Sequence, residues 1–150
     1  IADIREELIQ TGYIKQKYRN KKQKMLPPEK YQAEDGTIIL VGKNNLQNEQ
    51  VSFKLSRRGD LWFHVKDIPG SHVLITGNAN PSDETITFAG ELAASFSKAR
   101  YSNLVQVYVL DVKKLHKPTG TAPGFVTYDR EKTIRVTPDE SVIKSRKIGK

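Results

Sequence analysis

The stretch NPSDETITFAGELAASFSKARY, residues 80–101, decides the fold class because its apolar residues recur with a helical period. These residues form one wide stripe: Phe88, Leu92, Phe96 and Ala99, flanked by Ile86, Ala89 and Ala93. Asn80 or Ser82 can cap the first turn, two acids follow the cap, and two cations stand near the end, as the helix dipole favours. The pattern predicts one amphipathic helix over about 82–100.

The segments around this helix have the two-residue period or the β-branched content of strands. Strands are expected at 37–42, 51–56, 61–65, 71–76 and 104–112, and residues 124–128 and 133–138 are expected to form a hairpin. Arg57 to Asp60 has the composition of a hairpin turn. Strands on both sides of one substantial helix, without strand–helix–strand repetition, predict an α+β fold. We expect a largely antiparallel sheet with the helix packed on one face.

Residues 3–19 favour a further helix at the N-terminus, and Pro27-Pro28 ends any helix before the strands begin. The expected organisation is an N-terminal helix and basic arm over 1–28, followed by one domain over 29–150. The chain opens on Ile1, which is typical of a fragment or a processed product. Two basic patches are expected. They are the arm (Lys15, Lys17, Arg19, Lys21, Lys22 and Lys24) and a mobile or solvated loop (Lys113, Lys114 and Lys117).

The net charge suits either a polyanionic partner or a merely soluble basic protein, and the composition excludes several kinds of site. Lys plus Arg is 25 against 17 Asp plus Glu, giving a formal net charge of +8 and a pI of about 9.6. The absence of cysteine excludes disulfides, zinc–thiolate sites and thiol nucleophiles. No apolar run approaches the roughly 20 residues of a membrane helix. We therefore expect no membrane insertion.

The stretch DLWFHVKDIPGSHVLI, residues 60–75, concentrates polar and aromatic groups around a Pro-Gly turn. Leu61, Phe63 and Val65 are expected to face the core, which places Trp62 and His64 on the opposite face of the sheet. If the strands on either side of the turn pair, Lys66, Asp67, Ser71 and His72 fall near them. Such a group can stack on a base and hold a phosphate, or can be a satisfied structural network; the residues alone leave both open.

Catalysis and metal binding find little support in these residues. His64, Asp67, His72 and His116 lack the spacing of a metal site, and the chain has no H-E-x-x-H, G-x-S-x-G or phosphate-loop pattern. We expect a protein that is not an enzyme and that needs neither metal nor cofactor.

A second polar block, KNNLQN, occupies residues 43–48. Its amides can contact sugar and base edges, with Lys43 beside them for a phosphate. An amide-rich loop that bonds its own backbone is the alternative.

The sequence VGKNNLQNEQVSFKLSRRGDLWFHVKDIPGSHVLI, residues 41–75, resembles the NFACT-R domain, the C-terminal module of bacterial NFACT proteins. The likeness continues through the helix and through VYVLDVKKLHKPTGTAPGFVTY and KTIRVTP. Residues 1–24 resemble the end of the coiled-coil region that precedes this module. Members are described either as ribosome quality control factors or as fibronectin-binding protein A.

The resemblance implies an RNA-binding module of a cytoplasmic factor. Full-length members bind the obstructed large ribosomal subunit and recruit tRNA for alanine tailing of stalled chains, so rRNA and tRNA are the implied partners. The alternative is an anchorless, cell-surface adhesin module that binds fibronectin. The family's Asp-Arg motif belongs to its N-terminal domain, and Asp129-Arg130 is expected to be only a turn.

The RNA-binding residues that the resemblance implies fall into the two blocks. They are Lys43, Asn44, Asn45, Gln47 and Asn48 in the first, with Gly42 beside them, and Trp62, His64, Lys66, Asp67, Ser71 and His72 in the second, around Pro69 and Gly70.

Overall fold

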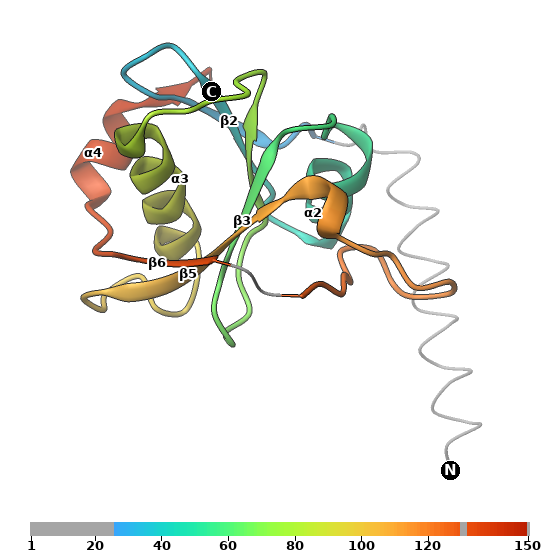
Figure 1. Ribbon diagram of the computed structural model, residues 1–150. Coiled ribbons are helices and arrows are strands. Elements are labelled where there is room, and N and C mark those ends of the chain that lie inside the picture. The colour runs from blue at the N-terminus through green and yellow to red at the C-terminus, as the bar shows by residue number, and fades with distance from the viewer. Residues whose placement is uncertain (1–25, 130–131, 150) are drawn as a thin grey trace.

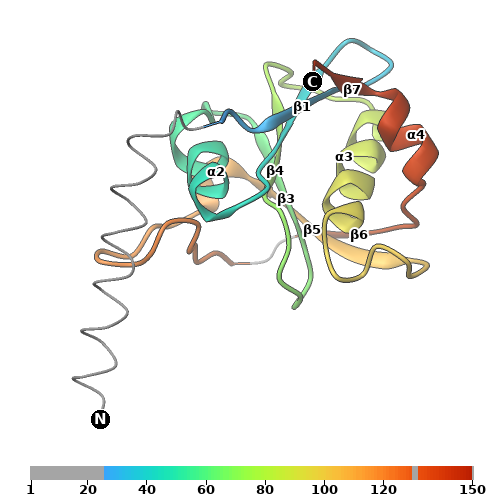
Figure 2. The same ribbon diagram turned by 180° about the vertical axis from the view of Figure 1, so that it is seen from behind.

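A computed structural model describes residues 26–129 and 132–149 and contains one sheet with helices on both faces (Figures 1 and 2). The strands are β1 (Glu29–Gln32), β2 (Ile38–Val41), β3 (Leu61–Val65), β4 (Val73–Thr76), β5 (Val105–Asp111), β6 (Lys132–Val136) and β7 (Lys147–Ile148). The helices are α2 (Asn45–Glu49), the π-helical turn η1 (Gln50–Lys54), α3 (Asp83–Ser95), the 3₁₀ turn η2 (Val112–Lys114) and α4 (Glu140–Ser145).

The seven strands form one antiparallel sheet in the order β6-β5-β3-β4-β2-β1-β7. The central strand β3 pairs with β5 along its whole length, from Leu61 opposite Asp111 to Val65 opposite Val107. The α+β fold with a largely antiparallel sheet is therefore confirmed. The strands β1 and β7, and the helix α4, were not expected from the sequence.

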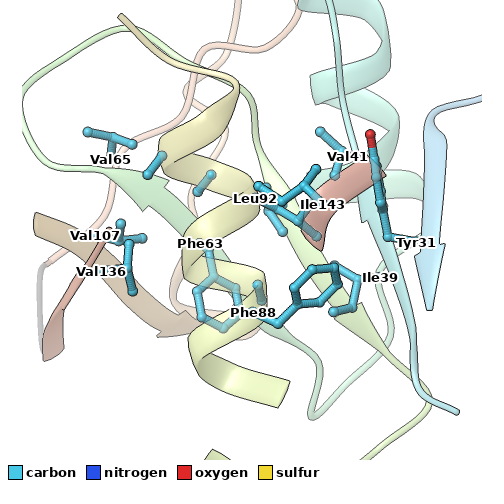
Figure 3. Packing of buried hydrophobic residues seen from close by; sticks show 14 of the residues in the cluster. Tyr31, Ile39, Val41, Phe63, Val65, Phe88, Leu92, Val107, Val136 and Ile143 are labelled. Carbon is cyan, nitrogen blue, oxygen red and sulfur yellow. The ribbon is translucent and has the colours of Figure 1, made fainter. Parts of the chain in front are cut away.

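Helix α3 covers one face of the sheet, as predicted, and forms the larger core with it (Figure 3). Ser82 caps the helix by accepting a hydrogen bond from the Thr85 amide. The helix ends at Ser95, earlier than the predicted 100. Ser97, two residues later, prevents the helix from continuing. Its hydroxyl donates to the Ala94 carbonyl and accepts from the Ala99 amide, so local hydrogen bonds replace helical ones.

The other face of the sheet is also covered, which the sequence pattern did not predict. Helix α2, the η1 turn and the segment 115–128 pack there over a second core. Its buried members are Leu40, Val51, Trp62, Leu74, Leu110, Val112 and Leu115.

The predicted strand at 51–56 is wrong, because this segment continues the helix that begins at α2. The Asn44 side chain caps α2 by accepting from the Gln47 amide, and a π-type bond from the Leu55 amide to the Gln50 carbonyl extends the helical path. Arg57 to Asp60 is a turn, but it joins η1 to β3 rather than two strands.

The predicted hairpin of 124–128 with 133–138 is also wrong. Strand β6 pairs with β5, and residues 124–128 make only an isolated bridge between His116 and Thr127. Gly124 lies in the left-handed region with φ +84 and donates its amide to the Glu49 carboxylate, which directs this segment toward α2.

The predicted N-terminal helix and the basic arm fall mostly on residues 1–25, outside the described residues, so the domain boundary near 28 stays a prediction. Within residues 26–129 and 132–149, no helix is long and apolar enough to cross a membrane.

Candidate nucleic-acid interface

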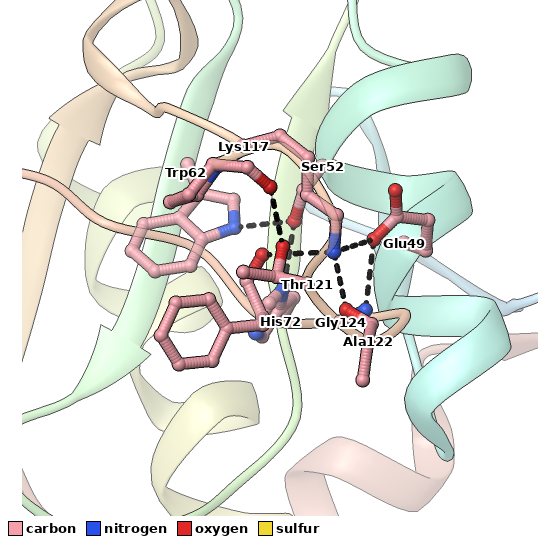
Figure 4. Close-up of polar contacts among 10 residues, drawn as sticks. Glu49, Ser52, Trp62, His72, Lys117, Thr121, Ala122 and Gly124 are labelled. Carbon is pink, nitrogen blue, oxygen red and sulfur yellow. Dashed lines mark hydrogen bonds and ion pairs between the residues drawn. The ribbon is translucent and has the colours of Figure 1, made fainter. Parts of the chain in front are cut away.

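A hydrogen-bonded network inside the protein joins Ser52 to Trp62 and His72 of the second polar block, and we call it the Ser52 network (Figure 4). The Trp62 indole Nε1 donates to Ser52 Oγ at 2.9 Å, and Ser52 Oγ lies 2.7 Å from His72 Nδ1. An indole can only donate, so the Ser52 hydroxyl proton is free to be donated to His72. When Ser52 donates in this way, His72 accepts at Nδ1 and is neutral, with its proton on Nε2.

Burial keeps the imidazoles of this network neutral. Desolvation, followed by the charges of His64 and Lys117, lowers the pKa of His72 to about 3. Desolvation also lowers the pKa of His64, although backbone hydrogen bonds with Val65 and Gly70 act in the opposite direction and raise it. The Trp62 ring stacks on His64 at 5.7 Å and meets His72 edge-on at 5.1 Å. The cluster is an aromatic packing unit with no net charge.

The amide block is tied into the same network. Asn48 Oδ1 accepts from the His72 amide at 3.0 Å, and Gln47 Oε1 accepts from the Lys43 amide at 2.8 Å. A Cβ on Gly42 would lie 2.2 Å from Asn48 Oδ1 and 2.8 Å from the Asn48 nitrogen. Glycine at position 42 therefore lets the two blocks touch.

Of the two interpretations left open by the sequence, the structural network describes the buried part of these blocks, which η1 and residues 115–128 cover. Five of the predicted binding residues are buried, namely Gln47, Asn48, Trp62, Ser71 and His72. His64 and Lys66 are half-buried, and only Lys43, Asn44, Asn45 and Asp67 are exposed. Among the described residues no buried side-chain polar atom lacks a partner. The geometry of the five buried residues is that of a scaffold, and RNA contact by the others stays a prediction.

Lys117 is a structural residue rather than part of a free basic loop. Its Nζ pairs with the Glu49 carboxylate at 3.1 Å and donates to the carbonyls of Ala122 and Phe125. Residues 115–128 are thereby tied to α2 (Figure 4). Of the other two cations of this predicted patch, Lys113 is exposed and Lys114 is half-buried.

A surface groove lies at the end of helix α3, outside the Ser52 network, and we call it the basic groove. Two adjoining hollows of about 650 and 490 Å³ form it, between the loop that follows α3, strands β1 and β7, and helix α4. Among the described residues, the charged side chains that line it are the cations Lys43, Lys98, Arg100, Lys144 and Lys147 and the acids Glu29 and Glu140. The cations outnumber the acids and offset the partial negative charge at the end of α3.

Aromatic rings are interleaved with these cations. The Lys43 ammonium lies 4.0 Å from the centre of the Phe96 ring. The Arg100 guanidinium lies 5.0 Å from the centre of the Tyr101 ring, and Tyr101 is 85% exposed. Both polar blocks hold this loop in place, because Lys43 packs on Phe96 and Gly70 bridges to Ser97.

Glu29 limits the positive charge of the groove. Its Oε1 is 3.4 Å from Lys43 Nζ and 3.6 Å from Lys147 Nζ. The Tyr31 hydroxyl donates to the other carboxylate oxygen, and burial together with Glu29 raises the pKa of Tyr31 well above its usual value, so it stays a donor.

Sequence reasoning missed most of the groove. It assigned Lys98 and Arg100 to the helix dipole and did not single out Tyr101. The signal was present in SKARY, residues 97–101, where an aromatic residue follows two cations at the end of the apolar stripe. Only the fold brings β1, β7 and α4 to this loop, and no local pattern reveals that.

A second groove, of about 720 Å³, carries the opposite charge. It lies at the beginning of α3, across α4 from the basic groove, and its acids are Glu34, Asp35, Asp83, Glu84 and Glu91. Hydrogen bonds, first from Thr37, lower the pKa of Asp35, whereas burial raises the pKa of Glu91. No group of three or more potential metal ligands occurs among the described residues.

Comparison with known proteins shows the family to which most of the chain is similar. Residues 29–128 match the family model of the NFACT protein RNA binding domain. The chain is 65% identical over 149 residues to the Rqc2 homolog RqcH of Streptococcus suis and 47% identical over 152 residues to that of Bacillus subtilis. These matches cover 99% and 98% of the chain, and 27% and 26% of the relatives. The chain thus spans about a quarter of their length.

A more distant relative and a solved structure agree with this match. The ribosome quality control complex subunit 2 of Schizosaccharomyces pombe is 36% identical over 96 residues, which is 59% of the chain and 9% of that protein. A structure described as the C-terminal of the fibronectin/fibrinogen-binding protein from Streptococcus suis superposes with a TM-score of 0.85 at 65% identity. It covers 97% of this chain and 60% of the solved one.

Proposed function

This chain belongs to the NFACT protein RNA binding domain family, and from that premise we propose that it is the RNA-binding module of a ribosome-associated quality control factor. The relatives named Rqc2 homolog RqcH, together with the yeast quality control subunit, support that role. In the finer form of the proposal, the module helps its full-length protein hold the obstructed large subunit and tRNA during alanine tailing. Its place of action is then the cytoplasm.

The observation that carries the proposal is the basic groove. Phosphate contacts need exposed cations, and single-stranded RNA recognition adds aromatic faces between them. The groove offers both, whereas the Ser52 network is internal. We propose a binding role without catalysis, because the cations and aromatic rings of the groove are sufficient for binding RNA and no nucleophile or acid–base pair is needed for it.

Pelleting of this chain with isolated large ribosomal subunits tests the proposal. Each phosphate contact releases condensed counterions, so the logarithm of the binding constant falls linearly with the logarithm of the salt concentration. We expect binding to weaken strongly between about 50 and 200 mM salt. Equal affinity at both concentrations contradicts the proposal.

Charge-reversed variants locate the interface. Lys98→Glu with Arg100→Glu changes the net charge of the groove, and Lys54→Glu with Lys113→Glu makes the same change at exposed residues outside it. We expect the first pair to abolish pelleting and the second pair to weaken it slightly. Equal losses mean that net charge alone drives binding.

Fibronectin binding is the second candidate, and the similarity to the C-terminal of the fibronectin/fibrinogen-binding protein favours it. Surface plasmon resonance against fibronectin fragments, with an unrelated basic protein alongside, tests it. A signal equal to that of the unrelated protein reflects charge alone and removes this candidate.

A further inference from the structure

We infer that the basic groove holds an unpaired RNA nucleotide, with its base stacked on Tyr101 and its phosphate held by the cations around that ring. The inference rests on the proposed function and deepens it, because it assigns the kind of RNA and the residue that selects it.

The first argument is the exposure of Tyr101. A tyrosine ring that is 85% exposed leaves most of its apolar area in water, next to a groove rather than on a flat surface. The Arg100 guanidinium lies over the ring at 5.0 Å and can cover only one of its two faces. A planar base on the other face would complete a cation–ring–base stack.

The second argument is the arrangement of charge around this ring. Arg100 and Tyr101 line both hollows of the groove, Lys98 lines one of them, and Lys144 and Lys147 line the other. Lys144 pairs with Glu140 and Lys147 with Glu29. These ion pairs are at the surface and can exchange their carboxylate for a phosphate, so a nucleotide whose base lies on Tyr101 has cations on both sides. The volume of about 650 Å³ is within the range of sites that enclose small ligands.

The third argument excludes a continuous duplex as the preferred ligand. Paired bases are stacked on each other and present only their edges, so the Tyr101 ring would have no base face to contact. An unpaired base in a loop, bulge or single strand has a free face, and stacking tolerates any base. Exposed Ser102 and Asn103 follow Tyr101 and can contact base edges.

Direct binding of three RNA ligands to this chain tests the inference. They are a short single strand, an abasic ribose–phosphate strand of the same length and charge, and a duplex of the same length. We expect the wild type to prefer the base-bearing single strand over the abasic one by about 5- to 150-fold, the range that stacking of one base supplies. Tyr101→Ala should remove this preference and leave abasic binding unchanged. Tyr101→Phe should retain the preference.

The controls separate failure of this inference from failure of the proposed function. Leu104→Ala removes a neighbouring apolar side chain that is 65% exposed and does not line the groove, and it should leave all three affinities unchanged. If Tyr101→Ala still prefers the base-bearing strand over the abasic one, while Lys98→Glu with Arg100→Glu lowers the affinity for every RNA ligand, the inference is wrong and the RNA-binding role stands. If Lys98→Glu with Arg100→Glu lowers the affinity for none of the RNA ligands, both the stacking site and the proposal that the groove binds RNA are wrong.

Discussion

Gly42 is the position where the two polar blocks come closest. A Cβ there would lie 2.8–2.9 Å from the backbone atoms of Asn48, and this backbone cannot move without disturbing α2. We expect Gly42→Ala to lower the free energy of unfolding by about 1–3 kcal/mol, the usual cost of overpacking. Urea denaturation measures this.

Gly90 provides the matched control for that substitution. A Cβ at Gly90 would lie 2.7 Å from Ile134 Cδ1, the far end of a flexible side chain, and alanine favours a helix by about 1 kcal/mol over glycine. Gly90→Ala should therefore change stability much less than Gly42→Ala. Equal losses would mean that the contact with Asn48 is not the cause.

His72 gives the fold a dependence on pH. In the unfolded chain a histidine binds its proton near pH 6.5, whereas the buried His72 has a pKa of about 3, so the folded protein binds fewer protons between these values. Stability therefore falls as the pH drops through this window, by up to about 1.4 kcal/mol per pH unit. Below about pH 3 no further loss comes from this group.

Comparison of variants isolates this contribution. Denaturation between about pH 7 and 4.5 should give a flatter dependence for His72→Gln than for the wild type, with His116→Gln, at an exposed position, matching the wild type. Protonation of carboxylates such as Asp35, whose pKa is lowered, also destabilises the fold in acid, but this contribution is the same in all three proteins. Parallel curves for His72→Gln and wild type would refute the assignment.

At the scale of elements, the ammonium group of Lys117 makes several of the contacts that hold the segment 115–128. Lys117→Met keeps the aliphatic stem and removes the contacts with Glu49 and two carbonyls, so we expect a loss of about 1–2 kcal/mol and faster amide exchange over 118–125. Hydrogen exchange followed by mass spectrometry measures this, with the exposed Lys113→Met as control. Unchanged exchange in Lys117→Met would show that the bridge between His116 and Thr127 suffices.

The sequence predicted the elements whose pattern is long and regular, and it failed where tertiary contacts decide. The stripe on α3 and the alternation in β3 and β5 are regular, because each buries one face or both in a core. Residues 51–56 also alternate, but the cap at Asn44 had already committed the chain to a helix. Alternation over six residues is too short to distinguish a strand from a helix that buries one side.

The candidate site was predictable only in part for the same reason. The blocks at 42–48 and 60–72 do converge, but their exposure depended on what covers the second face of the sheet. Part of that cover comes from 115–128, whose Pro and Gly residues suggested a free loop, and part from η1, which was predicted as a strand. Lys43 alone belongs to both the predicted block and the cations of the groove.

At the scale of the whole molecule, Glu29 lowers the positive charge that the groove presents, because it pairs with two of its lysines. Glu29→Gln removes the carboxylate that Lys43 and Lys147 share, and both lysines become free to bind phosphate. We expect single-stranded RNA to bind roughly 2- to 5-fold more tightly at low salt, as for loss of a surface ion pair, with a steeper salt dependence.

A matched substitution places this gain in the groove. Glu34→Gln makes the same change of net charge at the acidic groove, where Glu34 pairs with Arg146. It should alter RNA affinity much less than Glu29→Gln. Weaker binding by Glu29→Gln would mean that the carboxylate holds the lysines in their binding positions.

The opposite charges of the two grooves, at the two ends of α3, form an electric dipole along that helix. In the field of a polyanion this dipole experiences a torque as well as an attraction, which favours approach with the basic groove forward. Most collisions then begin near the productive orientation, and screening by salt slows association before it changes the lifetime of the bound state.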